Sequence, residues 1–506
     1  MTAGDCSREK KRIHRYNRRQ SVRKVLFLAA VLMAAAAFCC TAIRAFTTNL
    51  TDDEAYTYIN YVRAYQPLNL SWLIHLYSTC KANNHWLNTF LIWCTSQVLG
   101  PYSEAAIRLP NVVLFAGYLA AVLAALRRGR ISFLCSVFLI SNYYLNEFFG
   151  LGRGYGMAAA FVLFTLLAYG SWRRTGCKDG RYVLLILLCL TLGAASNTVV
   201  LLLYPSVGLL MLYHMIRGKR LGSFLRVHFI AAVLFVLCTC LLVRYHLEVS
   251  VRDTALYVGT QDYVHSTVME FLHMLVTGRT ASLALATLIL AATAAAGVIL
   301  VQGAVRRQSP NAVQGHHLNA AQVRHLNAVP ARRLNAVPVR HFRTDMDDAG
   351  AKVPNREETH AGVISKGAID YFWMLALFAL VSMAIGAVFH RGYLTGRTTL
   401  PFWPLVVLGG YGLAQAAAAE LAARRTSARR VLQIVSVLCA ALVFILFLKK
   451  VRLNSTRDWP WDYGTRERVA ESVQKTGDYP EDAIQDYTDI FYMAKYGLDI
   501  TPYLGP

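Results

Sequence analysis

Long apolar runs divide the chain into segments of about the length that crosses a membrane. A helix of roughly 20 apolar residues spans the hydrocarbon core of a bilayer, and the pattern predicts about eleven such helices. The boundary between the fifth and sixth is the least distinct, because only Asn197 separates them. The predicted spans lie near residues 25–46, 105–126, 131–148, 155–172, 182–196, 198–216, 222–243, 281–303, 368–389, 402–423 and 431–448. We therefore expect an all-α polytopic membrane protein.

The composition agrees with this class. Of the 506 residues, 55% are hydrophobic and only 16% are charged, and the mean hydropathy is +0.36. An ordinary soluble domain carries about 25% charged residues, so a large soluble enzyme and a disordered protein are both excluded. Most of the eleven cysteines lie within apolar runs, and no Cys/His zinc spacing occurs, which argues against a disulfide scaffold.

The net charge of +23 reflects topology rather than an affinity for nucleic acid. If the basic N-terminus stays in the cytoplasm, the cytoplasmic segments carry 34 of the 52 Lys and Arg, and the outer segments carry 18. This asymmetry is the one that the positive-inside rule describes. The predicted cytoplasmic segments are 1–24, 127–130, 173–181, 217–226, 304–366 and 424–430.

These boundaries predict three regions. A basic cytoplasmic N-terminus covers 1–24, a transmembrane domain covers 25–448, and an acidic, aromatic outer tail covers 449–506. Within the transmembrane domain, 47–104 forms the first outer loop. The basic loop 304–366 repeats Leu-Asn-Ala at an interval of eight residues and lacks apolar periodicity, so we interpret it as a disordered, low-complexity insertion.

Three consecutive acids follow the first predicted span. Thr51 and Glu54 have the spacing of a capping box, and acids favour a helix N-terminus. That structural role accounts for Glu54 well and for Asp52 adequately, but it does not require Asp53. A carboxylate here could act as a general base. The apolar positions that follow, Tyr56, Ile59 and Val62, recur at helical spacing. This spacing predicts a helix that lies at the membrane interface.

A second polar cluster, Asn83-Asn84-His85-Trp86, precedes the apolar run 87–99. Its structural explanation is the start of a second interfacial helix, with Asn as the N-cap and Trp as an anchor in the aromatic belt. A lone His is more often structural than catalytic. The functional alternative gives His85 a role beside the acids of the same outer loop.

Two further clusters place arginines at the same predicted membrane face. Glu147, Arg153 and Tyr155 lie in the turn between the third and fourth spans, where a Glu–Arg pair would be an equally good structural explanation. Arg391 and Arg397 lie between the ninth and tenth spans; they are either snorkelling side chains or ligands that bind phosphate oxygens. Together, the acids, the His and the arginines indicate group transfer from a lipid phosphate held at the headgroup level.

The order of these motifs resembles the GT-C glycosyltransferases, in the branch of the dolichyl-phosphate-mannose protein mannosyltransferases and their bacterial relatives that use polyprenyl-phosphate sugars. The resemblance covers most of 25–425. The chain departs from the family pattern at Asn84, where Asp is common, and at Trp86, where Pro is common, and loop 304–366 has no counterpart. The matching segments are Asp53-Glu54-Ala-Tyr, Asn84-His85-Trp86-Leu87, Arg108-Leu-Pro110, Arg153-Gly-Tyr155-Gly and Arg397-x-x-Leu400-Pro401.

The resemblance implies a GT-C-like bundle and an inverting transfer of a sugar from a polyprenyl-phosphate donor to an acceptor hydroxyl on a lipid, glycan or protein. It implies Asp53 as the base, with Glu54 and His85 orienting the loop or the acceptor. The leaving phosphate would be stabilised by Arg153, Arg391 and Arg397. Further candidates are Asp52, Asn84 and Tyr155. The sequence identifies no cofactor; a divalent metal could take part, but the sequence does not support one.

Two other classes remain open on the sequence. A transporter or flippase of lipid-linked sugars would also carry polar residues at membrane depth, although no inverted repeat is visible. A non-catalytic membrane scaffold leaves Asp53 unexplained. The Ala-rich spans and short loops favour a bacterial inner membrane, with the active site facing the periplasm or exterior.

Overall fold

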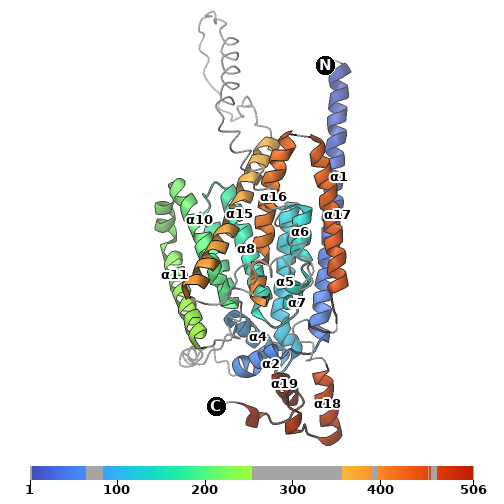
Figure 1. Ribbon diagram of the computed structural model, residues 1–506, viewed down its shortest axis with the longest axis vertical. Coiled ribbons are helices and arrows are strands. Elements are labelled where there is room, and N and C mark those ends of the chain that lie inside the picture. Colours follow the sequence, from blue (N-terminus) through green and yellow to red (C-terminus); the bar gives the residue numbers. More distant parts are fainter. Residues whose placement is uncertain are drawn as a thin grey trace, which may run out of the picture.

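The computed structural model describes residues 3–63, 84–252, 356–389, 396–424, 426–453, 455–456 and 464–504. In these ranges all the regular elements are helices, as the hydropathy pattern predicts. Figure 1 shows most of them side by side in one elongated bundle, with the N-terminus at the upper end and the C-terminus at the lower end.

The long helices of the bundle follow the predicted apolar runs. The first, α1, continues without a break from the basic N-terminus into the apolar run. The long helices have these bounds: α1 (Ala3–Thr47), α5 (Glu104–Arg127), α8 (Gly154–Arg174), α9 (Gly180–Ser196), α10 (Tyr204–Arg217), α11 (Leu221–Arg252), α15 (Arg356–Phe389), α16 (Trp403–Arg424) and α17 (Thr426–Lys450).

Six helical segments of the described chain are long and apolar enough to cross a membrane, so the protein has the character of a multi-pass membrane protein. Two shorter apolar helices accompany them, Gly180–Ser196 and Ile369–Ile385. The predicted span 281–303 lies outside the described residues. Helix α15 begins at Arg356, so the end of loop 304–366, predicted as disordered, is instead the first turns of a helix.

The predicted span 131–148 is wrong as a single helix. It consists of two short helices, α6 (Phe133–Ile140) and α7 (Tyr143–Phe149), which meet at Ser141 and Asn142. The Asn142 side chain accepts a hydrogen bond from the Leu145 amide and so begins the second helix. Asn favours such N-cap positions because it satisfies an otherwise unpaired amide.

Asn197 separates two helices, as the sequence predicts. It has extended backbone angles and its side chain accepts from the Val199 amide, which starts a 3-10 turn, η2 (Thr198–Leu203), that leads into α10. The run 182–216 is therefore two helices, and the polar residue marks their junction.

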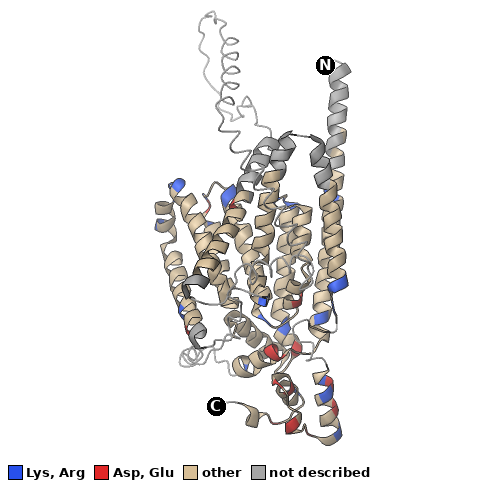
Figure 2. Ribbon diagram, in the orientation of Figure 1, with Lys and Arg blue, Asp and Glu red and all other residues tan. Residues whose placement is uncertain are grey.

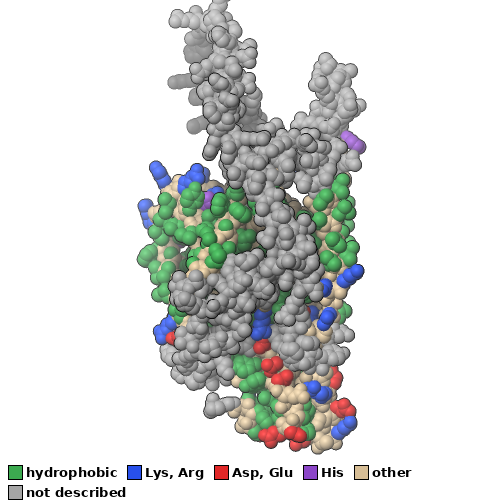
Figure 3. Space-filling view, viewed as in Figure 1, with side chains coloured by type: hydrophobic (Ala, Val, Ile, Leu, Met, Phe, Trp, Pro, Cys, Tyr) green, Lys and Arg blue, Asp and Glu red, His purple; other side chains and the backbone are tan. Residues whose placement is uncertain are grey.

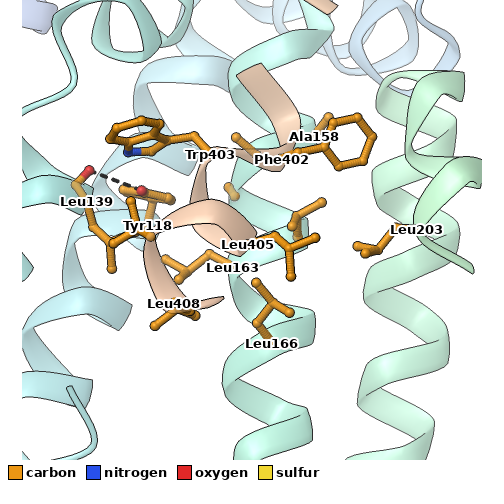
Figure 4. Packing of buried hydrophobic residues seen from close by; sticks show 14 of the residues in the cluster. Tyr118, Leu139, Ala158, Leu163, Leu166, Leu203, Phe402, Trp403, Leu405 and Leu408 are labelled. Carbon is orange, nitrogen blue, oxygen red and sulfur yellow. Dashed lines mark hydrogen bonds between the residues drawn. The ribbon is translucent and has the colours of Figure 1, made fainter. Parts of the chain in front are cut away.

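The start of α16 contributes two large aromatic side chains to the core of the bundle. A 3-10 turn, η5 (Gly396–Phe402), brings Phe402 and Trp403 between α8 and the short helix α6. Figure 4 shows both aromatic side chains among Tyr118, Leu163 and other buried residues. The Trp403 indole donates to the Phe138 carbonyl oxygen at 3.1 Å, so this large side chain is buried with its polar atom satisfied. The same turn carries Arg397 toward the lower end.

The lower end of the bundle is built from the first predicted outer loop and the C-terminal tail. The loop contains α2 (Asp52–Thr57), a π-helical turn η1 (Tyr58–Val62) and α4 (Trp86–Leu99), and the tail contains α18 (Thr465–Thr476) and α19 (Tyr487–Lys495). Figure 2 shows acidic residues gathered at this end, and Figure 3 shows hydrophobic side chains over the flanks of the bundle above it. The interfacial placement of these helices stays a prediction.

Candidate active site at the lower end of the bundle

The acidic cluster begins with the capping box that the sequence predicts. The Thr51 hydroxyl accepts from the Glu54 amide at 3.3 Å, and a Glu54 oxygen accepts from the Thr51 amide at 3.0 Å. This reciprocal pairing satisfies two amides at the start of α2. It fixes three carboxylates on one helical turn, and these then face different surroundings.

Glu54 is fully buried and paired with Arg108. The two Glu54 oxygens accept from Arg108 Nε at 2.8 Å and Nη2 at 2.7 Å, in a bidentate pair, and the Gly152 amide donates to Oε1 at 2.6 Å. Burial alone would raise the pKa of Glu54, but the Arg108 guanidinium and these hydrogen bonds lower it below its usual value. Glu54 therefore stays ionised as a structural tie between α2, α5 and the turn before α8.

Arg108 also fastens the end of α1. Its Nη1 donates to the carbonyl oxygens of Ala45 and Thr48, and its Nη2 donates to that of Asn49. The sequence identified this arginine only as part of a motif and assigned it no role. A charge one turn into an apolar run is costly unless it is paired, and that cost was the signal for a buried partner.

Asp53 faces a different direction and meets two arginines from distant segments. Its Oδ2 accepts from Arg397 Nη1 at 2.6 Å and lies 3.4 Å from Arg153 Nη2. Arg153 also donates to the Asp53 carbonyl oxygen at 3.0 Å and to the Thr57 hydroxyl at 3.1 Å. The Asp53 side chain is 17% exposed, against 0% for Glu54, so the site is accessible where Glu54 is not.

Tyr155 and His85 form the wall beside these arginines. The Arg153 and Arg397 guanidinium carbons lie 6.0 and 5.9 Å from the centre of the Tyr155 ring, within the range of a cation–π contact. The His85 ring meets Tyr155 edge-on, with 5.1 Å between ring centres. Close approach of the chain here requires glycine at position 154, because a Cβ atom would lie 2.8 Å from the His85 ring.

His85 is held in its neutral form. Burial lowers its pKa well below the usual value, and the positive charges of Arg153 and Arg397 lower it further. Its Nε2 is buried and has no hydrogen-bond partner among the described residues. His85 is also the N-cap of α4, so the predicted Asn cap is wrong. The Asn84 side chain instead accepts from the Thr89 hydroxyl at 2.8 Å.

Asp52 turns toward the C-terminal tail. Its Oδ1 accepts from the Tyr487 amide at 3.0 Å, and the Tyr487 ring packs edge-on against Tyr56 at 4.7 Å between centres. Burial, with a smaller contribution from Asp486, raises the pKa of Asp52. The tail therefore docks on the same helix that carries Asp53, through the Asp52 hydrogen bond and the Tyr56–Tyr487 ring contact.

Glu147 does not pair with Arg153. It pairs instead with Arg44 of α1 at 3.0 Å, and both side chains are buried. Arg44 also donates to the Ser455 carbonyl oxygen at 2.8 Å. Glu147 lies on α7, which packs against α1, whereas Arg153 follows the next turn and faces α2. The alternative of a Glu147–Arg153 pair is wrong for this reason.

The structure thus brings together Asp53, His85, Arg153, Tyr155 and Arg397, and it places Glu54 behind them. Arg391 lies outside the described residues. Among the residues that the structure describes, no group of three or more His, Cys, Asp or Glu is arranged to hold a metal ion. Comparison with protein-family models, with curated proteins and with solved structures finds no match for this chain.

Proposed function

We propose that the protein is an integral-membrane glycosyltransferase that moves a sugar from a polyprenyl-phosphate donor to an acceptor hydroxyl. The observation that carries the proposal is the convergence of Arg153 and Arg397 on one oxygen of Asp53. These residues are separated by 100 and 344 positions from Asp53 in the chain. An accessible carboxylate between two guanidinium groups combines a proton acceptor with a phosphate clamp in one place.

The charges of this cluster suit an anionic donor. Arg153 and Arg397 together carry two positive charges, Asp53 carries one negative charge, and His85 is neutral. These groups therefore have a formal excess of one positive charge, which favours a phosphate. The guanidinium fork binds phosphate oxygens with two parallel hydrogen bonds, so a bound donor would share these arginines with Asp53 and would loosen their hold on its carboxylate.

In the proposed step, the acceptor oxygen attacks the anomeric carbon and the bond from that carbon to the phosphate oxygen breaks. The bonding electron pair leaves with the lipid phosphate, whose new charge Arg153 and Arg397 stabilise. The acceptor proton passes to the Asp53 carboxylate, and the sugar configuration inverts because the attack comes from the face opposite the leaving group. His85 and Tyr155 shape the wall beside the sugar.

The membrane setting supports this chemistry. The site lies at the lower end of a bundle whose apolar helices are long enough to span a bilayer, so a lipid tail could lie beside them while its phosphate reaches the cluster. The Lys and Arg asymmetry predicts that the Asp53 end faces outward. We propose a bacterial inner membrane, with the cluster facing the periplasm or exterior.

The test is the substitution Asp53→Asn, which keeps the size of the side chain and its ability to accept a hydrogen bond, but removes its basicity. We expect sugar transfer to fall by roughly two to four orders of magnitude, while binding of the polyprenyl-phosphate sugar stays within about threefold of wild type. Transfer and donor binding are measured on the same detergent-solubilised protein. The matched control is Asp482→Asn, an exposed aspartate of the tail, with no change in either quantity.

Two results would contradict the proposal in different ways. Near-normal transfer by Asp53→Asn would remove Asp53 as the base and would direct attention to Asp52. The other result is movement of lipid-linked sugar across a vesicle membrane, with sugar transfer to the acceptor unchanged when Asp52, Asp53 or Glu54 is substituted. The protein would then be a transporter or flippase.

A further inference from the structure

A second arginine cluster lies at the end of the bundle opposite Asp53. Arg130 Nη1 and Arg174 Nη2 donate to the same hydroxyl oxygen, that of Ser171, at 2.9 and 3.2 Å. The Ser171 hydroxyl donates its own proton to the Leu167 carbonyl oxygen at 2.7 Å. Two cationic side chains thus meet at one small neutral group. Figure 2 shows Lys and Arg at this upper end of the helices.

No described carboxylate forms an ion pair with either arginine. The contrast with the preceding residue is direct, because Arg173 pairs with Asp370 at 2.5 Å. Asp370 is therefore committed to Arg173, and Asp179, in the turn after α8, caps α9 through the Arg181 amide. Burial and the charges of Arg174 and Arg128 lower the pKa of Arg130, which is the expected result of placing like charges close together in a partly desolvated site.

This arrangement differs from ordinary surface arginines. A snorkelling arginine extends its guanidinium into water, whereas these two turn toward a buried serine. Ser171 is only 4% exposed, while Arg174 is exposed and Arg130 is half-buried, so the cluster is open to a ligand from one side. An anion there would neutralise two positive charges and would accept their remaining hydrogen bonds.

We propose that Arg130, Arg174 and Ser171 form a binding site for a phosphate group at the upper end of the bundle, separate from the Asp53 site. Phosphate fits because its tetrahedral oxygens can accept from two guanidinium groups at once, and basic pockets between membrane helices suit lipid headgroups. The phosphate could belong to an anionic phospholipid or to a soluble phosphate. The proposal does not depend on the glycosyltransferase assignment.

The experiment titrates delipidated, detergent-solubilised protein with phosphatidylglycerol, phosphatidylcholine or inorganic phosphate and follows the thermal-unfolding midpoint, because a ligand of the folded state raises it. We expect the double variant Arg130→Gln/Arg174→Gln to bind phosphatidylglycerol at least about tenfold more weakly than wild type. The matched control, Arg127→Gln/Lys178→Gln, removes the same charge from exposed positions nearby and should stay within about twofold of wild type. Equal loss in both double variants would overturn the site.

Ser171→Asp provides a second, independent test. The new carboxylate would lie within reach of both guanidinium groups, so this variant should unfold at a higher temperature without ligand and should lose the response to phosphatidylglycerol. A wild-type response in Ser171→Asp would overturn the proposal. The source of the phosphate is identified by the probe whose binding weakens in the double variant Arg130→Gln/Arg174→Gln. Phosphatidylglycerol alone identifies a lipid headgroup, and inorganic phosphate at millimolar concentration identifies a soluble ligand.

Discussion

Asp53 and Glu54 are neighbouring carboxylates on the first turn of α2, yet their surroundings differ in almost every respect. Glu54 has no exposed surface and pairs with one arginine in a bidentate geometry. Asp53 is partly exposed, and two arginines share one of its oxygens. A closed pair with balanced charge stabilises a fold, whereas an open cluster with an excess of positive charge can exchange partners with a ligand.

The helix itself produces this difference. Consecutive residues on an α-helix point about 100° apart, so the two carboxylates face separate neighbours even though they share one turn. Glu54 points toward α5 and the glycine turn before α8, where a side chain at position 152 would crowd Ile107. Asp53 points toward the start of α8 and the turn before α16.

The largest expected effect is on stability. The capping box alone predicts that Glu54→Gln is mild, because Gln also serves at that position. Arg108 changes this expectation, since the substitution leaves its buried guanidinium without a countercharge. We expect the free energy of unfolding to fall by about 3–5 kcal/mol, as measured by denaturant or thermal unfolding in detergent. The matched substitution Asp53→Asn should cost less, about 1–3 kcal/mol, because the buried Arg153 keeps its hydrogen bonds to the Asp53 carbonyl oxygen and the Thr57 hydroxyl; equal losses would show that the two sites are not distinct.

The next effect is on donor affinity. Arg397 contacts Asp53 from a separate segment and carries a half-buried side chain, so Arg397→Ala should leave the fold intact. We expect binding of a polyprenyl-phosphate sugar to weaken by about ten- to a hundredfold, the value of a hydrogen bond to a charged group. Arg397→Lys should recover part of the loss, because it restores the charge without the fork. Donor affinity unchanged in Arg397→Ala would exclude this arginine from the phosphate clamp.

The smallest effect concerns Asp52 and the pH dependence of stability. Its pKa is raised in the folded state, mainly by burial, so the folded protein binds the proton more tightly than the unfolded chain. The contribution to stability is therefore complete below the ordinary pKa of an aspartate and is lost as the pH rises through the higher folded value. Asp52→Asn should remove this dependence and should change stability at pH 7 by less than about 1 kcal/mol.

Unfolding midpoints of wild type and Asp52→Asn between pH 3.5 and 7 measure this effect. The Tyr487 amide can still donate to the Asn side chain, so the tail should stay docked. A steeper pH dependence in Asp52→Asn than in wild type would contradict the assignment.

Much of the candidate site could be predicted from local patterns. The capping box at Thr51 and Glu54 was readable because helix N-termini need side-chain partners within three residues. The outer-loop Asp, the His of the second cluster and two of the arginines were named from their positions beside apolar runs, and the structure brings them together. What these patterns could not provide was the partner of each charge, because pairing depends on packing between helices far apart in sequence.

Glu147 and Arg108 illustrate this limit. Sequence proximity favoured Arg153 as the partner of Glu147, but α7 packs against α1, where Arg44 lies 103 positions earlier. Nothing near Arg108 in the chain indicated Glu54, and the pair forms only when α5 crosses the end of α1. The division of the run 131–148 was readable in principle, since Ser141 and Asn142 interrupt it and Asn is a strong helix start.

By itself, the sequence determined where helices form and where many of them begin, since apolar runs, polar junctions and capping residues act within a few positions. It also determined the excess of positive charge on one set of loops. Only the tertiary structure decided that Glu54 is a closed structural ion pair and that Asp53 meets Arg153 and Arg397. The physical reason is that burial and charge pairing depend on three-dimensional neighbours, and one residue along a helix is enough to change all of them.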